Sequence, residues 1–255
     1  MKELILFTIK DIIKNKVIIA YTLFLLVTTL VLFSLEDNSG KAILGILNTI
    51  LIVTPIITLI FTTIQYYNSY EFIELILSQP ISRISVIISE YVAINIALIM
   101  AVAAGMGIPL LIFSPEKEAL WLLMISVFLT LSCSAIALLI SVYIRDKAKG
   151  IGTSLLIWFY FNFIYDGIIL LILFTFSEYP LEKPTLALIA LNPIDLARVT
   201  VMLQLDISAL MGYTGALYKD FFGSMTGIFF SMGCFALWII IPLWITIVHF
   251  GKKDL

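Results

Sequence analysis

Six long runs of apolar residues constrain the fold of this 255-residue chain more than any other feature. Each run is long enough to cross the hydrocarbon core of a bilayer, about 30 Å thick, as an α-helix that rises about 1.5 Å per residue. Hydrophobic residues make up 62% of the chain and charged residues only 13%, so one soluble core could not hide the apolar surface. We therefore predict an all-α integral membrane protein with a single transmembrane domain over 1–255. The predicted spans are 17–35, 43–64, 91–113, 120–144, 151–176 and 225–248.

Basic residues are distributed unevenly between the two sides that six crossings create. Ten of the 15 Lys and Arg residues fall on the side that carries both termini, and five fall on the other side. Segments rich in Lys and Arg stay in the cytoplasm. We therefore expect a multi-pass protein of a bacterial or archaeal cell (inner) membrane, with both termini cytoplasmic.

Residues 1–16 form an amphipathic pattern ahead of the first span. Four isoleucines recur at helical spacing on one face, and polar residues lie on the opposite face. The isoleucines are Ile5, Ile9, Ile12 and Ile13. This pattern predicts an interfacial helix on the cytoplasmic leaflet. A cleaved signal peptide is the alternative, but its basic region would be unusually long, and no small-residue cleavage site follows the apolar run before Glu36.

The connection 65–90, between the second and third spans, is too polar to cross a bilayer. It contains a short amphipathic helix whose polar edge carries Glu71 and Glu74. Pro80 ends this helix because proline disfavours helical geometry in the residue before it, and Ser82 can cap the next helix. An interfacial helix that contacts only headgroups is the alternative. Acidic residues are unfavourable beside an anionic leaflet, so we expect this segment to contact a basic protein surface.

The connection 177–224, between the fifth and sixth spans, is the second long one and should be helical and extracytoplasmic. Pro193 followed by Asp195 is typical of the first turn of a helix. Its apolar content is too high for a free loop. Two interpretations remain open: a lid packed on the helix bundle, or a docking surface for a periplasmic partner. The residues assigned to such a contact are Asn192, Pro193, Asp195, Arg198, Gly212 and Gly215.

Asn162 and Asp166 are polar residues well inside the fifth span, one turn apart on the same face. An intramembrane carboxylate is costly and is a candidate for function. It could contact a substrate or carry a proton. Alternatively, it forms a hydrogen bond with a neighbouring helix, for example with a tyrosine or serine side chain.

Several kinds of chemistry find no support in the sequence. No Gly-x-x-x-x-Gly-Lys-Ser/Thr pattern occurs, so the chain has no phosphate-binding loop of its own. His249 is the only histidine, which excludes a histidine-based metal cluster, and no Ser/His/Asp motif is present. We therefore predict no catalytic residue, no metal ligand and no cofactor in this chain. The net charge of −2 gives no sign of nucleic-acid binding.

Six spans, an N-terminal amphipathic helix and the motif LSQPISR at 77–83 together resemble the ABC-2 type permeases of ABC transporters. The resemblance covers the whole chain. It implies a non-catalytic membrane subunit that works as a homodimer in the lipid bilayer. It also implies a coupling helix that docks on a separate cytoplasmic ABC ATPase, which binds ATP and Mg. The residues assigned to coupling are Glu71, Phe72, Glu74, Leu77, Ser78, Gln79, Pro80 and Arg83.

A narrower resemblance rests on NPIDLAR at 192–198 and LMGYTGA at 210–216. These motifs look like those of the permeases of the nitrous-oxide reductase maturation system. The resemblance implies a periplasmic copper-handling partner and a role in assembling the copper centre of that reductase. This chain departs from such a role in having no evident metal-ligand set, which favours an ATP-driven machine acting on a periplasmic partner.

Three alternatives remain at this point. The chain could belong to an ABC-2 exporter of another small molecule or lipid. It could be a secondary transporter that needs no ATPase, because Gly105, Gly107 and Pro109 could break the third span. It could also be a membrane scaffold that transports nothing.

Overall fold

The computed structural model describes residues 2–36, 38–114, 117–176, 182–204 and 225–252, and these contain helices but no strand. Six helices are long and apolar enough to span a membrane, which confirms the all-α, six-span prediction. They are Lys16–Leu35 (α2), Ser39–Asn68 (α3), Arg83–Phe113 (α5, η1 and α6), Lys117–Tyr143 (α7), Lys147–Thr175 (α8, η2 and α9) and Thr226–Lys252 (most of α13, Met225–Lys252). Four further helices are α1 (Lys2–Ile13), α4 (Tyr70–Leu77), α10 (Glu182–Ala190) and α11 (Pro193–Gln204).

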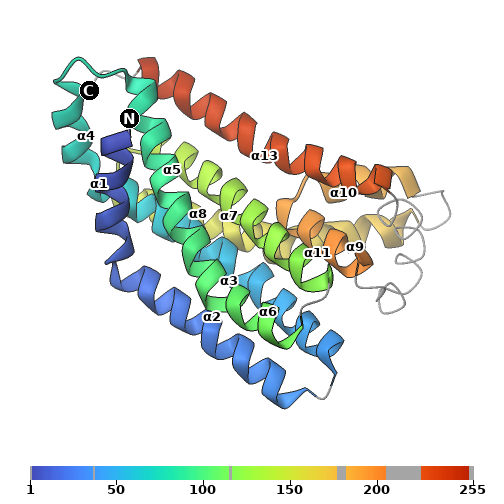
Figure 1. The fold of residues 1–255 in the computed structure, drawn as a ribbon. Coiled ribbons are helices and arrows are strands. Elements are labelled where there is room, and N and C mark those ends of the chain that lie inside the picture. Colours follow the sequence, from blue (N-terminus) through green and yellow to red (C-terminus); the bar gives the residue numbers. More distant parts are fainter. Residues whose placement is uncertain (1, 37, 115–116, 177–181, 205–224, 253–255) are drawn as a thin grey trace.

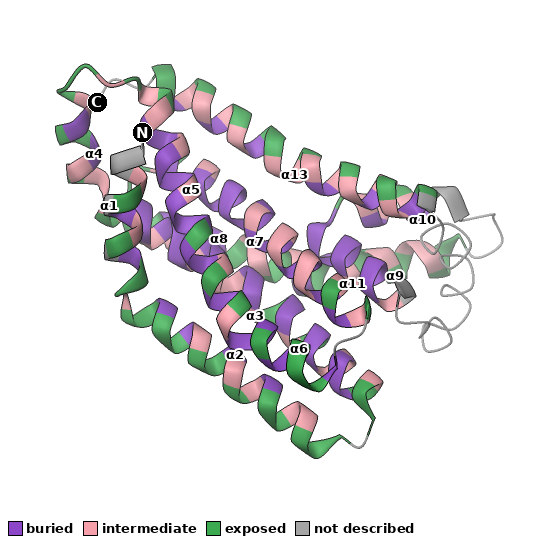
Figure 2. Ribbon diagram, viewed as in Figure 1, coloured by how far each residue is buried: buried purple, intermediate pink, exposed green. Residues whose placement is uncertain are grey.

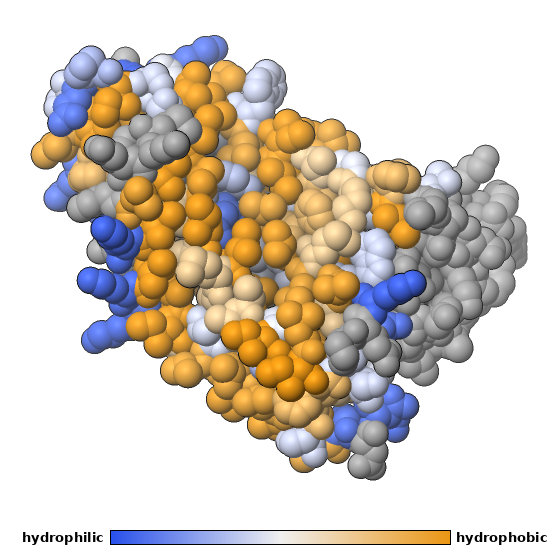
Figure 3. Space-filling model, viewed as in Figure 1, coloured by the Kyte–Doolittle hydropathy of each residue, from blue (hydrophilic) through white to orange (hydrophobic). Residues whose placement is uncertain are grey.

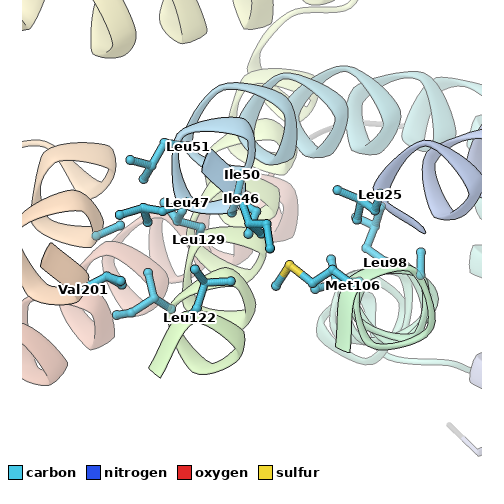
Figure 4. Packing of buried hydrophobic residues seen from close by; sticks show 14 of the residues in the cluster. Leu25, Ile46, Leu47, Ile50, Leu51, Leu98, Met106, Leu122, Leu129 and Val201 are labelled. Carbon is cyan, nitrogen blue, oxygen red and sulfur yellow. The ribbon is translucent and has the colours of Figure 1, made fainter. Parts of the chain in front are cut away.

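Helix α7 forms the centre of the bundle. About two thirds of its apolar segment, 67%, is buried, compared with 11% for the α8–α9 span. Leu122 and Leu129 of α7 meet the isoleucines and leucines of α3, and Met106 lies beside them (Figure 4). Exposed residues follow the outer faces of α2 and α13 (Figure 2). Those exposed faces are rich in Leu, Ile, Val and Phe, as expected where lipid is the solvent.

The third span passes through its glycines without a sharp break. It consists of α5 (Arg83–Val102), the π-helical segment η1 (Ala103–Gly107) and α6 (Ile108–Phe113). Gly105 allows α2 to approach closely: a Cβ added there would lie 2.7 Å from the carbonyl oxygen of Thr22 and 2.8 Å from Cβ of Leu25. The glycine is therefore required for helix packing, as is common where membrane helices approach one another closely.

Helix α1 packs against α5 of the same chain, and the two lie side by side in Figure 1. Ile12 is fully buried, and Ile5 and Ile9 pack partly buried against the main core. Ile13 is exposed, so only part of the predicted isoleucine stripe faces the protein. The amphipathic helix predicted for residues 1–16 is present.

The contact at Gly105 predicts a clear difference between two glycine substitutions. Gly105→Ala should destabilise the protein by about 1–3 kcal/mol, because backbone atoms of α2 cannot move aside without losing contacts with η1. Gly167→Ala is the matched control, since a Cβ there would meet no atom within 4 Å. It should be neutral or slightly stabilising, because alanine favours helix. Thermal unfolding in detergent measures both, and equal unfolding temperatures would contradict this packing account.

Candidate functional site

Helix α4 lies at the end of the bundle where α1 begins and α13 ends (Figure 1). It stops before Ser78, and the N–H of Ile81 donates to the carbonyl oxygen of Gln79 at 2.7 Å, which forms a tight turn around Pro80. Ser82 then caps α5, its Oγ accepting from the N–H of Ser85 at 3.2 Å. The short helix, the break at proline and the serine cap are all as predicted.

The buried face of α4 packs against α3 and α5 and belongs to a hydrophobic cluster that also includes residues of α7 and α13. Ile73 is 1% exposed and Ile76 5% exposed. Their cluster includes Tyr66 of α3, Phe250 of α13, and residues of α5 and α7. The remaining buried members are Val86, Ile87, Tyr91, Ala135, Leu138 and Val142. A force applied to α4 therefore acts on several membrane helices together.

Polar contacts fix the start of α4 to its neighbours. Ser69 donates from Oγ to Oε1 of Glu90 at 3.0 Å, and Gln65 donates from Nε2 to the same Ser69 oxygen at 3.2 Å. Glu90 is almost fully buried, which makes this carboxylate the acceptor on which the junction depends. Burial, and secondarily the carboxylate of Glu74, raise the pKa of Tyr70 on the first turn. Tyr70 is therefore neutral and serves as an aromatic contact of Tyr66.

The end of α3 is also tied to the turn between α7 and α8. Tyr67 donates from its hydroxyl to the carbonyl oxygen of Ile144 at 2.7 Å, and Lys147 donates from Nζ to Oδ1 of Asn68 at 2.8 Å. Gly150 makes room for this arrangement, because a Cβ at that position would overlap the ring of Tyr67. The sequence analysis missed these residues: each bond joins residues about 77 or 79 positions apart, which no local pattern shows.

The outer face of α4 and the following turn remain open. Of the residues assigned to coupling, Glu71, Glu74, Ser78, Gln79 and Pro80 are exposed. Phe72, Leu77 and Arg83 are half-buried, and Arg83 donates from Nη1 to the carbonyl oxygen of Gly251 at 3.4 Å. A groove of about 420 Å³ is lined by Glu74, Leu77, Ser78, Ile81 and Arg83. Its lining combines one carboxylate, one guanidinium and the aliphatic side chains of Leu77 and Ile81, so it could accept a protein element that carries both charge and apolar surface.

A second polar site lies where α10 and α11 meet at a bend of 114°. Asn192 is fully buried at this corner. Its Nδ2 donates to the carbonyl oxygen of Phe161 at 2.9 Å and to Oδ2 of Asp195 at 2.8 Å. Its Oδ1 accepts from the N–H of Ile194 at 3.0 Å. One side chain thus holds the bend and joins it to the fifth span.

Asp166 is paired with a residue of α11. Arg198 places Nη1 at 2.8 Å from Oδ2 of Asp166 on α9 (Tyr165–Thr175) and at 3.2 Å from Oδ1 of Asp195. The expected partner, a tyrosine or serine of a neighbouring span, is therefore replaced by an arginine that sequence analysis assigned to an external contact. Asn162 lies in η2 (Tyr160–Ile164) and donates to the carbonyl oxygen of Trp158 at 3.2 Å, one turn back in its own span.

The residues assigned to a periplasmic partner fall into two groups. Asn192, Pro193 and Asp195 are buried, and Arg198 is half-buried. Gly212 and Gly215 lie outside the described residues. Helix α11 packs against α3, α7 and α13, which is the arrangement expected of a lid on the bundle. Contact with an external partner stays a prediction. Over the described part of the chain, no three His, Cys, Asp or Glu side chains are grouped as metal ligands.

Two comparisons with known proteins identify the family of the chain. Residues 8–255 match the family described as ABC-2 family transporter protein. The chain is also similar to a protein of Pseudomonas aeruginosa named "Probable ABC transporter permease protein NosY", with 27% identity over 180 residues. That alignment covers 67% of this chain and 62% of the relative, which is less than two thirds of the relative's length. Because the family match extends over nearly the whole sequence, the chain belongs to the ABC-2 family of transporter permeases.

Proposed function

We propose that this permease receives mechanical work from a separate cytoplasmic ABC ATPase through α4. The ATPase binds ATP and Mg, and two copies of it act on a homodimer of this chain. The observation that carries the proposal is the packing of α4: Ile73 and Ile76 are buried in a cluster with residues of α3, α5, α7 and α13, while Glu71 and Glu74 stay exposed. Membership of the ABC-2 family implies an ATPase partner.

The path of motion follows from the contacts of α4. Closure of the ATPase pair would displace α4 as a rigid body together with the ends of α3, α5 and α13. Near the middle of α13, Trp238 donates from Nε1 to the carbonyl oxygen of Ala190 at 2.9 Å. Thr200 of α11 donates from its hydroxyl to Ser231 of α13 at 3.1 Å. These two bonds would carry the displacement into the α10–α11 corner.

We further propose that the work is applied to a periplasmic copper-handling protein during assembly of the copper centre of nitrous-oxide reductase. Two observations support this role: the NPIDLAR motif at 192–198, and similarity to a relative whose name is NosY. Because the motif lies at the α10–α11 corner, we assign the output of the machine to this region. In this role the permease changes the conformation of its partner, and copper does not need to cross the spans.

Charge reversal on α4 tests the docking proposal. Glu74→Lys should weaken co-purification of the ATPase about tenfold, since a buried or rim charge pair at an interface contributes about 1.4 kcal/mol or more. Glu36→Lys is the matched control, because Glu36 is also exposed but ends α2 far from α4. Equal recovery of the ATPase with both variants would contradict docking at α4.

Phe250 tests transmission separately from docking. Phe250→Leu keeps an apolar side chain in the cluster that includes Ile73 and Ile76 but loosens its packing, so the ATPase should still bind while its stimulation by the permease falls. Phe229→Leu is the control, since Phe229 is 74% exposed on the same helix. A Phe250→Leu complex with full stimulation would show that α13 does not carry the motion.

Deletion of the gene tests the maturation role. The account predicts nitrous-oxide reductase that is present but lacks part of its copper, measured by metal analysis of the purified reductase, and complementation should restore the metal. Fully loaded reductase in the deletion strain would overturn this role. The permease would then serve an ABC-2 exporter of another small molecule or lipid.

A further inference from the structure

An apolar groove runs between α2 and α3 on the half of the bundle nearest α1 and α4. Its volume is about 570 Å³. It is lined chiefly by Lys16, Val17, Ala20, Phe24, Val53 and Ile57. From Lys16 to Phe24 the groove follows about two turns of helix, a length of about 12 Å at 1.5 Å per residue. This is an elongated slot, open to the surface along its length and charged at one end only.

The floor of the groove is apolar although it contains a tyrosine. Tyr21 is 3% exposed, and its hydroxyl bonds to Oγ1 of Thr54 at 3.0 Å. The hydroxyl groups of Tyr21 and Thr54 therefore form a hydrogen bond with each other and are not available to a ligand. Whatever occupies the slot must present hydrocarbon to it, because burying an unpaired polar group there would be costly.

Lys16 gives the groove its single charged end. It is the first residue of α2 and is exposed, and Lys14 two positions earlier is exposed as well. Among the described residues, neither lysine forms an ion pair with a carboxylate. Figure 3 shows a broad apolar surface over α2 and α5, bordered by hydrophilic side chains beside α1. An apolar slot with a cationic end is complementary to an amphiphile that has an anionic head.

We propose that this groove is a specific site for an anionic phospholipid of the leaflet on the α1 and α4 side. One acyl chain lies along Val17, Ala20 and Phe24, and the phosphate contacts Lys16. By the distribution of basic residues, that leaflet is the cytoplasmic one. The site is separate from α4, so it goes beyond the coupling role and does not depend on it.

Native mass spectrometry of the purified full-length permease tests the site with phosphatidylglycerol and phosphatidylcholine of identical acyl chains. Lys16→Gln should reduce the affinity for phosphatidylglycerol about fivefold, the effect of one lysine near an anionic headgroup, and leave phosphatidylcholine unchanged. Lys149→Gln is the control: Lys149 is exposed in the first turn of α8 (Lys147–Phe159), outside the groove, and its substitution should change the affinity for neither lipid. Equal losses for both lysine variants would overturn the site, because they would indicate only a general attraction to basic surface.

Filling the slot tests the acyl-chain half of the proposal. The Ala20→Phe permease should lose one bound lipid. The Ala148→Phe permease, which carries the same change at an exposed position of α8, should keep that lipid. Unchanged retention in Ala20→Phe would overturn the proposal. So would a change of oligomeric state with no loss of lipid, since that would assign the groove to a second copy of the chain.

A photoactivatable phosphatidylglycerol with a diazirine on its acyl chain provides a measurement that needs no variant. Adducts should map to residues 17–24 and 53–57 of the wild-type protein. Adducts spread evenly over the exposed faces of α2 and α13 would contradict a specific site.

Discussion

The burial of Ile73 and Ile76 in one hydrophobic cluster with Tyr66 and Phe250 is the interaction on which the rest of the account depends. The cluster joins a helix of only eight residues to residues of α3, α5, α7 and α13 and leaves the acidic edge of that helix exposed. A free amphipathic helix of this length would be only marginally stable in water, because the entropic cost of helix nucleation exceeds the stabilisation that two turns of backbone hydrogen bonds provide. Packing against the spans therefore determines that α4 exists as a helix.

The α10–α11 corner, which contacts the middle of two spans, is built on a different principle. There, buried polar side chains fix a bend that hydrophobic packing alone would not specify. Asn192 satisfies three backbone or side-chain partners, and Arg198 joins α11 to Asp166 of the fifth span. Helix α13 takes part in both regions, through Phe250 in the cluster of α4 and Trp238 at the corner. Central helix α7 is the most buried span.

Much of the fold could be predicted from the sequence, because bilayer thickness and apolar runs determine where spans occur. The break at Pro80 and the cap at Ser82 were also local in origin. The residue pairs that define the two sites could not be predicted from local sequence. The pairs Tyr67–Ile144 and Asp166–Arg198 depend on how the helices pack. Arg198 was assigned to an external contact together with the other residues of the NPIDLAR motif, which lies in the connection between the fifth and sixth spans. In the structure its charge is needed within the chain, between two carboxylates.

Site-specific photo-crosslinking from α4 tests the central claim most directly. A benzoylphenylalanine at Leu75, which is 61% exposed on α4, should form an adduct with the cytoplasmic ATPase when both proteins are expressed together. The same probe at Leu120, 58% exposed at the other end of the bundle, should form none. An ATPase that co-purifies with the permease but never crosslinks from position 75 would contradict the assignment of α4 as the helix through which this permease is driven.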